Sequence, residues 1–104
     1  MANRWRGEVA LTVNGQRHLA RLSLGALAAL EETLEVGSLV ALVERFETRA
    51  FSSRDVLALL GAGLRGGGAE ISDADLAEAE IEGGPVAAAK AAAELLARAF
   101  VVPE

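Results

Sequence analysis

The chain has no cysteine, one histidine and two prolines among its 104 residues. The lack of cysteine excludes disulfides, thiol nucleophiles and thiolate metal sites. Because His18 is the single imidazole, a metal site built from several histidines is excluded as well. Several large classes of enzyme and metalloprotein are therefore ruled out before any motif is considered.

Long apolar runs are also missing. The opening MANRWRGEVALTV has two arginines with no long hydrophobic stretch after them, and the FVV near the end is far too short to span a bilayer. We therefore expect a cytoplasmic protein with no membrane partner.

Positive charge is scarce, since ten Lys and Arg face fifteen Asp and Glu for a net charge of -5. Nucleic acid is not an expected partner, because phosphate binding needs concentrated positive charge. The arginines are unevenly placed: Arg4, Arg6, Arg17 and Arg21 are offset before residue 30 only by Glu8. This basic N-terminal segment could orient a partner or a neighbouring copy, or it could be ordinary solvated charge.

Aromatic residues make up only 4% of the chain, although 52% of it is hydrophobic. The core must therefore be built from Ala, Leu and Val. A domain of this length buries roughly 65% of the surface of its unfolded chain. The apolar surface that is left over could serve a partner.

Asn14-Gly15 lies between two alternating segments and has the residue types of a type I′ turn, whose central positions both need positive φ. Pairing across this turn gives an apolar face of Val9, Leu11, Val13, His18, Ala20 and Leu22. The other face carries Glu8, Thr12, Arg17, Leu19 and Arg21. A lone hairpin is marginally stable, so it must pack on the rest of the chain, and His18 is interpreted as a partly buried structural residue.

Apolar residues then recur at helical spacing. Ser23, Ser38 and Ser53 are predicted to cap three helices, the first ending at Gly37 and the third at the glycines 66–68, which would form a flexible link. Their predicted stripes are Leu24, Leu27, Leu30 and Leu34; Leu39, Leu42, Val43 and Phe46; and Val56, Leu57, Leu60 and Leu64.

Two more helices follow. Ser72 with Asp75 resembles a capping box, with Ile71 and Leu76 as a hydrophobic staple, and this helix is expected to end at Gly83-Gly84. Pro85 suits the first turn of the last helix, whose predicted inward stripe is Val86, Ala89, Ala93, Leu96 and Phe100. The prediction is one α+β, mainly α domain over 1–104, with a hairpin at about 7–22 and four to five short helices at about 24–101.

Two patterns resemble ligand sites. Residues 61–66 read GAGLRG and match GxGxxG, but that motif works between a strand and the start of a helix, and here it ends a helix. The acids between Glu70 and Glu82 lack the order and turn glycine of an EF-hand and are interpreted as a solvated helix face. With no catalytic set or cofactor box, we expect no enzyme, cofactor, metal or small-molecule substrate.

Together, several stretches resemble the small tail protein family of gene transfer agents, the phage-like particles made by alphaproteobacteria. They are GEVALTVNGQRHLARLSLGALAALEETL, GSLVALVERF, SSRDVLALLGAGLR, ISDADLAEAEI and AAAELLARAF. The resemblance runs from about Asn3 to Phe100. Its most specific parts are residues 6–8 leading into the turn at Gly15, and residues 24–31.

The resemblance implies a role in building a long, non-contractile tail. The family is often labelled a tail tube protein, but it also resembles tail assembly chaperones, which coat the tape measure protein, recruit tube subunits of major tail protein and are absent from the finished particle. The helical pattern favours the chaperone, because a tube subunit should be rich in long strands that close into a ring. The chaperone would work in the cytoplasm of the producing bacterial cell. A tail component retained in, and associated with, the particle and a small regulatory binding module remain alternatives, and self-association stays open.

We predict partner contacts at Trp5, Arg17 and Arg21 on the hairpin and at Phe46 and Phe51 around the second helix. Trp5 could be an interface anchor or a lid over the hairpin, and the phenylalanines could simply be core. The hairpin is interpreted as an appendage whose outer edge offers unpaired backbone groups to another chain.

Overall fold

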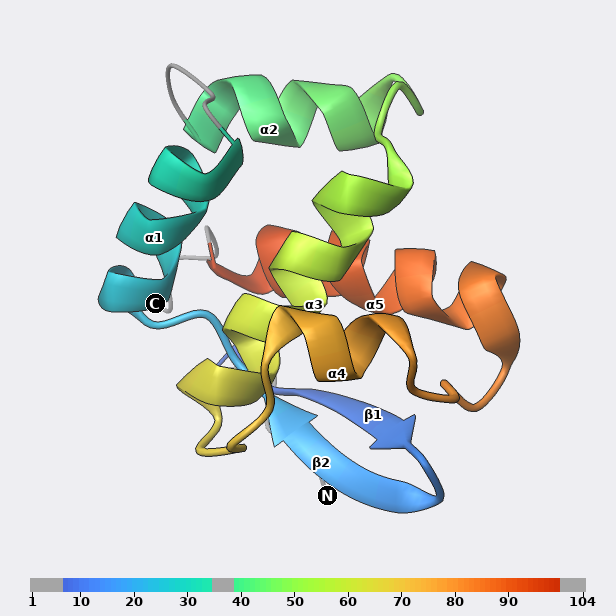
Figure 1. Cartoon of the computed structure of the whole chain (residues 1–104). Helices are drawn as coiled ribbons and strands as arrows, with labels where there is room; N and C mark the ends of the chain where they lie inside the picture. Colours follow the sequence, from blue (N-terminus) through green and yellow to red (C-terminus); the bar gives the residue numbers. More distant parts are fainter. Residues whose placement is uncertain (1–6, 35–38, 100–104) are drawn as a thin grey trace.

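The computed structural model describes residues 7–34 and 39–99. In these residues an antiparallel hairpin is followed by five helices, which confirms the predicted α+β, mainly α class. The elements are β1 (Val9–Val13), β2 (Gln16–Ala20), α1 (Leu24–Leu34), α2 (Leu39–Glu47), α3 (Ser53–Gly66), α4 (Asp73–Ala77) and α5 (Gly84–Ala99). Figure 1 shows the hairpin at one end of the molecule and α2 at the other, with α3, α4 and α5 between them.

The hairpin has the predicted turn and register. Asn14 and Gly15 have φ angles of 51° and 77°, as a type I′ turn requires, and Leu11 pairs with His18. The buried residues of its inner face are Val9, Leu11, Val13 and Ala20, while His18 is half-buried. The inner face is therefore part of the main core.

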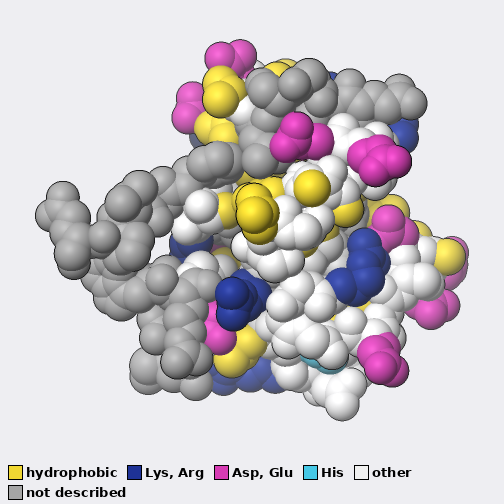
Figure 2. All heavy atoms as spheres, turned by 90° about the vertical axis from the view of Figure 1, so that its left-hand side faces the viewer, with side chains coloured by type: hydrophobic (Ala, Val, Ile, Leu, Met, Phe, Trp, Pro, Cys, Tyr) yellow, Lys and Arg dark blue, Asp and Glu magenta, His cyan; other side chains and the backbone are white. Residues whose placement is uncertain are grey.

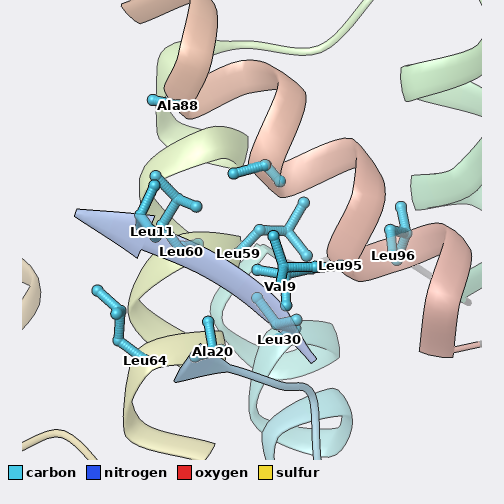
Figure 3. Packing of buried hydrophobic residues seen from close by; sticks show 14 of the residues in the cluster. Val9, Leu11, Ala20, Leu30, Leu59, Leu60, Leu64, Ala88, Leu95 and Leu96 are labelled. Carbon is cyan, nitrogen blue, oxygen red and sulfur yellow. The ribbon is translucent and has the colours of Figure 1, made fainter. Parts of the chain in front are cut away.

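α3 is the central helix and packs against α1, α4, α5 and β2. Leu59, Leu60 and Leu64 are at most 2% exposed. Figure 3 shows side chains from β1, α3 and α5 pointing into one shared cluster. The helix begins one residue earlier than predicted, because Ser52 is the N-cap and forms a reciprocal capping box with Asp55, which corrects the assignment to Ser53.

The end of α3 lies directly against β2. A Cβ on Gly66 would stand 2.2 Å from the carbonyl oxygen of Arg21, and one on Gly67 would stand 2.0 Å from that of Leu19. Arg21 also donates its backbone N–H to the Gly63 carbonyl at 2.9 Å. The glycines 66 and 67 do end the helix, but they allow close packing of helix and strand, so the interpretation of a flexible link is corrected.

The stripe predicted for α1 is confirmed at Leu30 and Leu34, which are buried, but its first member Leu24 is 83% exposed. The stripe predicted for α5 is displaced, since Val86 is 81% exposed. The predicted helix end at Gly37, the cap at Ser38 and the stripe residue Phe100 lie outside the described residues. The inward residues of α5 are Ala88, Ala91, Ala92, Leu95 and Leu96. Because nearly every position at the start of α5 is apolar, several rotations of the helix satisfy the pattern equally well, and packing against α3 selects one. Figure 2 shows the side that carries α1, where hydrophobic side chains lie exposed at the surface.

The prediction that the fourth helix continues to Gly83 is wrong. α4 ends at Ala77, and Ile81 instead forms an antiparallel bridge with Val13. Asn14 donates its N–H to the Glu80 carbonyl at 2.7 Å, and the Glu82 N–H is donated to the Thr12 carbonyl at 3.0 Å. These backbone groups bind β1, so they cannot continue the helix.

Candidate interaction site

An apolar groove of about 450 Å³ lies between α3, α4 and the beginning of α5. Its lining consists of Phe51, Ser52, Ser53, Val56, Leu57, Leu60, Leu76, Ala77, Ala79, Ile81, Gly84, Pro85, Ala88 and Ala89. No lining side chain is charged. The groove therefore offers apolar burial to a partner and little that could bind an ion or activate a substrate.

The polar atoms at one end of the groove belong to the cap of α3. The Ser52 hydroxyl accepts the Asp55 N–H at 3.2 Å. On the opposite wall the exposed Val86 follows Pro85 directly and precedes Ala89 by three residues. The apolar surface thus continues past the rim along α5.

Acidic residues follow the α4 wall. Ala77, Ala79 and Ile81 line the groove, and the exposed Glu78 and Glu80 alternate with them in the sequence. Among the residues that the structure describes, the ion pairs use other carboxylates. This wall therefore carries negative charge that no described cation neutralises.

A nearly buried ion pair holds α2 against the start of α3. Asp55 is 3% exposed, and its Oδ1 lies 2.9 Å from Nη1 of Arg45. Its Oδ2 accepts the Ser52 N–H at 2.9 Å. Beside this pair, the rings of Phe46 and Phe51 stack with centroids 4.6 Å apart and planes 8° from parallel. Phe51 therefore reaches the groove from a position fixed by α2.

The predicted partner residues do not form one surface. Phe46 and Phe51 meet each other, and both are half-buried. Arg17 and Arg21 are exposed on or just after β2, at the end of the molecule opposite α2 in Figure 1. Trp5 lies outside the described residues. The groove itself was missed because its walls come from three segments distant in sequence. The alternation of Ala77, Ala79 and Ile81 with glutamates was its one local signal.

The hairpin edges are partly covered by the chain itself, which corrects the expectation of an open edge. Residues 80–82 bind β1 next to the turn. At its other end, the Glu8 carbonyl accepts a hydrogen bond from Arg98. The glycines 66 and 67 pack against the end of β2. These contacts leave the hairpin edges only partly open to another strand.

A comparison with protein families matches residues 6–101 to the family described as phage tail tube protein, GTA-gp10. The chain belongs to this family. It is thus a gene transfer agent tail protein by family, which bears out the resemblance read from the sequence. No curated protein and no solved structure matches it significantly.

The description of the GTA-gp10 family names a structural protein of the tail, and structural tail proteins are not a class of enzymes. Within the described ranges, no three His, Asp or Glu side chains are grouped so that they could hold a metal ion. The GxGxxG match lies within α3, where Gly63 provides space for Leu95, since a Cβ there would stand 2.7 Å from a Leu95 methyl. No helix in the described part is long and apolar enough to cross a bilayer.

Proposed function

We propose that the chain is a non-enzymatic tail assembly chaperone of a gene transfer agent, which binds the tape measure protein and the tube subunits during assembly. The observation that carries this proposal is the scarcity of strand. In the described residues, β1 and β2 have five residues each, and the named elements that follow them are helices.

A tube subunit needs long strands that continue a sheet from one subunit to the next around a ring. The hairpin supports that role poorly, because residues 80–82 bind one edge next to the turn and the end of α3 packs against the last residues of the other strand. A helical body with an open apolar groove instead suits a protein that binds helical segments of a partner.

A tail component retained in the particle is the alternative, and the printed description of the family as a tail tube protein favours it. A small regulatory binding module has no comparable support, because the family match spans residues 6–101 and points to tails.

Quantitative mass spectrometry of purified particles and of the producing-cell lysate tests the proposal. The major tail protein serves as the positive control for tails in the particle sample. We expect peptides of this chain to be abundant in the lysate and absent from particles. Many copies per tail would overturn the chaperone proposal and establish the structural alternative.

A further inference from the structure

We infer that the groove between α3, α4 and α5 is the docking site for an amphipathic helix of another tail protein, with leucine-type residues on one face and Lys or Arg beside them. The inference deepens the proposed function and rests on it for the class of partner. The kind of segment that would bind follows from the length and lining of the groove and from the charged residues beside it.

The length of the groove suits a helix. Its α3 wall runs from Ser53 to Leu60, which at the helical rise is about 10 Å, or two turns. A docked helix contacts such a groove through residues at i, i+3, i+4 and i+7, which also span two turns. The small Ala77, Ala79 and Ala89 on the walls would let the backbone of a helix come close.

The lining disfavours a charged ligand. It contains no charged side chain, and its side-chain polar atoms are the hydroxyls of Ser52 and Ser53 at one end, of which Ser52 already accepts the N-cap bond from Asp55. A ligand carrying charge into this groove would lose its hydration without gaining a partner. The inserted face of the partner must therefore be apolar.

The border of the groove determines the flanks of the partner. Asp75, Glu78 and Glu80 are exposed on the segment that forms one wall. Between Glu70 and Glu82 there are six acidic residues and no Lys or Arg. Basic residues beside the apolar face would meet this charge, whereas acidic flanks would be repelled. A second copy of this chain, with its net charge of -5, is disfavoured for the same reason.

Fluorescence anisotropy with two designed peptides tests the inference on the full chain. Both peptides are labelled helices with leucines at i, i+3, i+4 and i+7, and the flanks are lysines in one and glutamates in the other. We expect the lysine peptide to bind at least about tenfold more tightly, with an affinity that falls as salt rises. Equal binding of the two peptides, or no binding of either, would overturn the inference.

Variants then locate the binding site. Ala77→Arg adds bulk and positive charge at an exposed position of the groove wall, and it should weaken lysine-peptide binding by about tenfold or more. Ala28→Arg makes the same change on the exposed side of α1 and should leave binding unaltered. Equal effects of the two would show that the peptide binds elsewhere. Ala89→Arg, from the α5 wall, repeats the test if Ala77→Arg disturbs folding.

Removing the charge tests the border separately. The double variant Glu78→Gln/Glu80→Gln should weaken lysine-peptide binding by about threefold to tenfold and flatten its salt dependence, since exposed charge contacts contribute modestly. Glu32→Gln/Glu47→Gln removes the same charge from exposed sites on α1 and α2 and should have no effect. A dimer in native mass spectrometry that Ala77→Arg dissociates would assign the groove to a second copy and overturn the inference.

The two proposals fail separately. If the lysine peptide binds in the groove but the chain is found in finished tails, the groove inference stands and the chaperone role falls. If the chain is absent from particles and neither peptide binds, the chaperone role stands and the groove is not its docking site.

Discussion

Replacing Gly66 by alanine should destabilise the protein, although the same replacement favours an ordinary helix. The new Cβ would stand 2.2 Å from the Arg21 carbonyl oxygen, which is backbone and cannot rotate away. Moving the strand end aside would also stretch the 2.9 Å bond from the Arg21 N–H to the Gly63 carbonyl. The loss should therefore come from both steric overlap and a strained hydrogen bond.

The magnitude follows from these terms. Overpacking costs about 1–3 kcal/mol and a weakened hydrogen bond about 0.5–1.5 kcal/mol, while the helix propensity of alanine returns about 0.5–1 kcal/mol. We expect a net loss of about 1–3 kcal/mol in the free energy of unfolding. For a chain of this size that corresponds to a fall in Tm of about 5–20 °C.

Thermal and urea unfolding followed by circular dichroism measure this loss, with Gly25→Ala as the matched control. A Cβ on Gly25 of α1 would stand 3.9 Å from the Ser23 hydroxyl, so the substitution introduces no overlap. That variant should be as stable as the wild type or up to about 1 kcal/mol more stable. If Gly66→Ala matched Gly25→Ala, the close packing of α3 on β2 would be refuted as the reason for glycine at position 66.

Two further substitutions test the polar contacts. Asp55→Ala should lower the free energy of unfolding by about 2–4 kcal/mol, because it removes the capping box and leaves Arg45 without its partner. Asp73→Ala breaks a pair in which both side chains are 43% exposed, and it should lower the free energy of unfolding by at most about 1 kcal/mol. Equal losses for the two variants in urea unfolding would contradict this expectation. Asn14→Ala should cost about 1–3 kcal/mol, because Asn14 has a φ of 51° and accepts the Glu80 N–H at 2.8 Å. Asn14→Gly keeps the φ and loses only the hydrogen bond, so it should retain more stability than Asn14→Ala, and the reverse order would rule out the proposed role of backbone conformation at this turn.

The sequence predicts well what neighbouring residues determine. The turn at Asn14, the strand register and the cap at Ser72 depend on contacts between residues at most eleven positions apart, and all three are confirmed. Ser23 likewise accepts the Ala26 N–H at 3.1 Å, as expected of an N-cap. The cap of α3 was displaced by one residue because Ser52 and Ser53 are adjacent and chemically equivalent, and only Ser52 has Asp55 three residues after it.

Helix rotation and long-range contacts were less predictable. In α5 the run of alanines supplies no contrast between faces, so Val86 was expected inside and lies outside. The glycines 66 and 67 carry no local sign that a strand passes within contact distance, and they were interpreted as a link. In both cases the element that determines the packing is tens of residues away in the sequence. It is α3 for the rotation of α5, and β2 for the glycines at the end of α3.

The segment after α4 links the candidate site to the hairpin. The backbone of residues 80–82 binds β1, while the side chains of Ala79 and Ile81 line the groove. The exposed Glu78 and Glu80 alternate with these two residues in the sequence, so one short stretch contributes apolar side chains to the groove wall and acidic residues next to it. A helix over the same residues would have distributed these side chains around an axis and left the edge of β1 uncovered. The non-helical course of residues 78–82 therefore contributes to the groove wall and covers the edge of β1 next to the turn, and it is the main structural argument against a subunit that assembles through that edge.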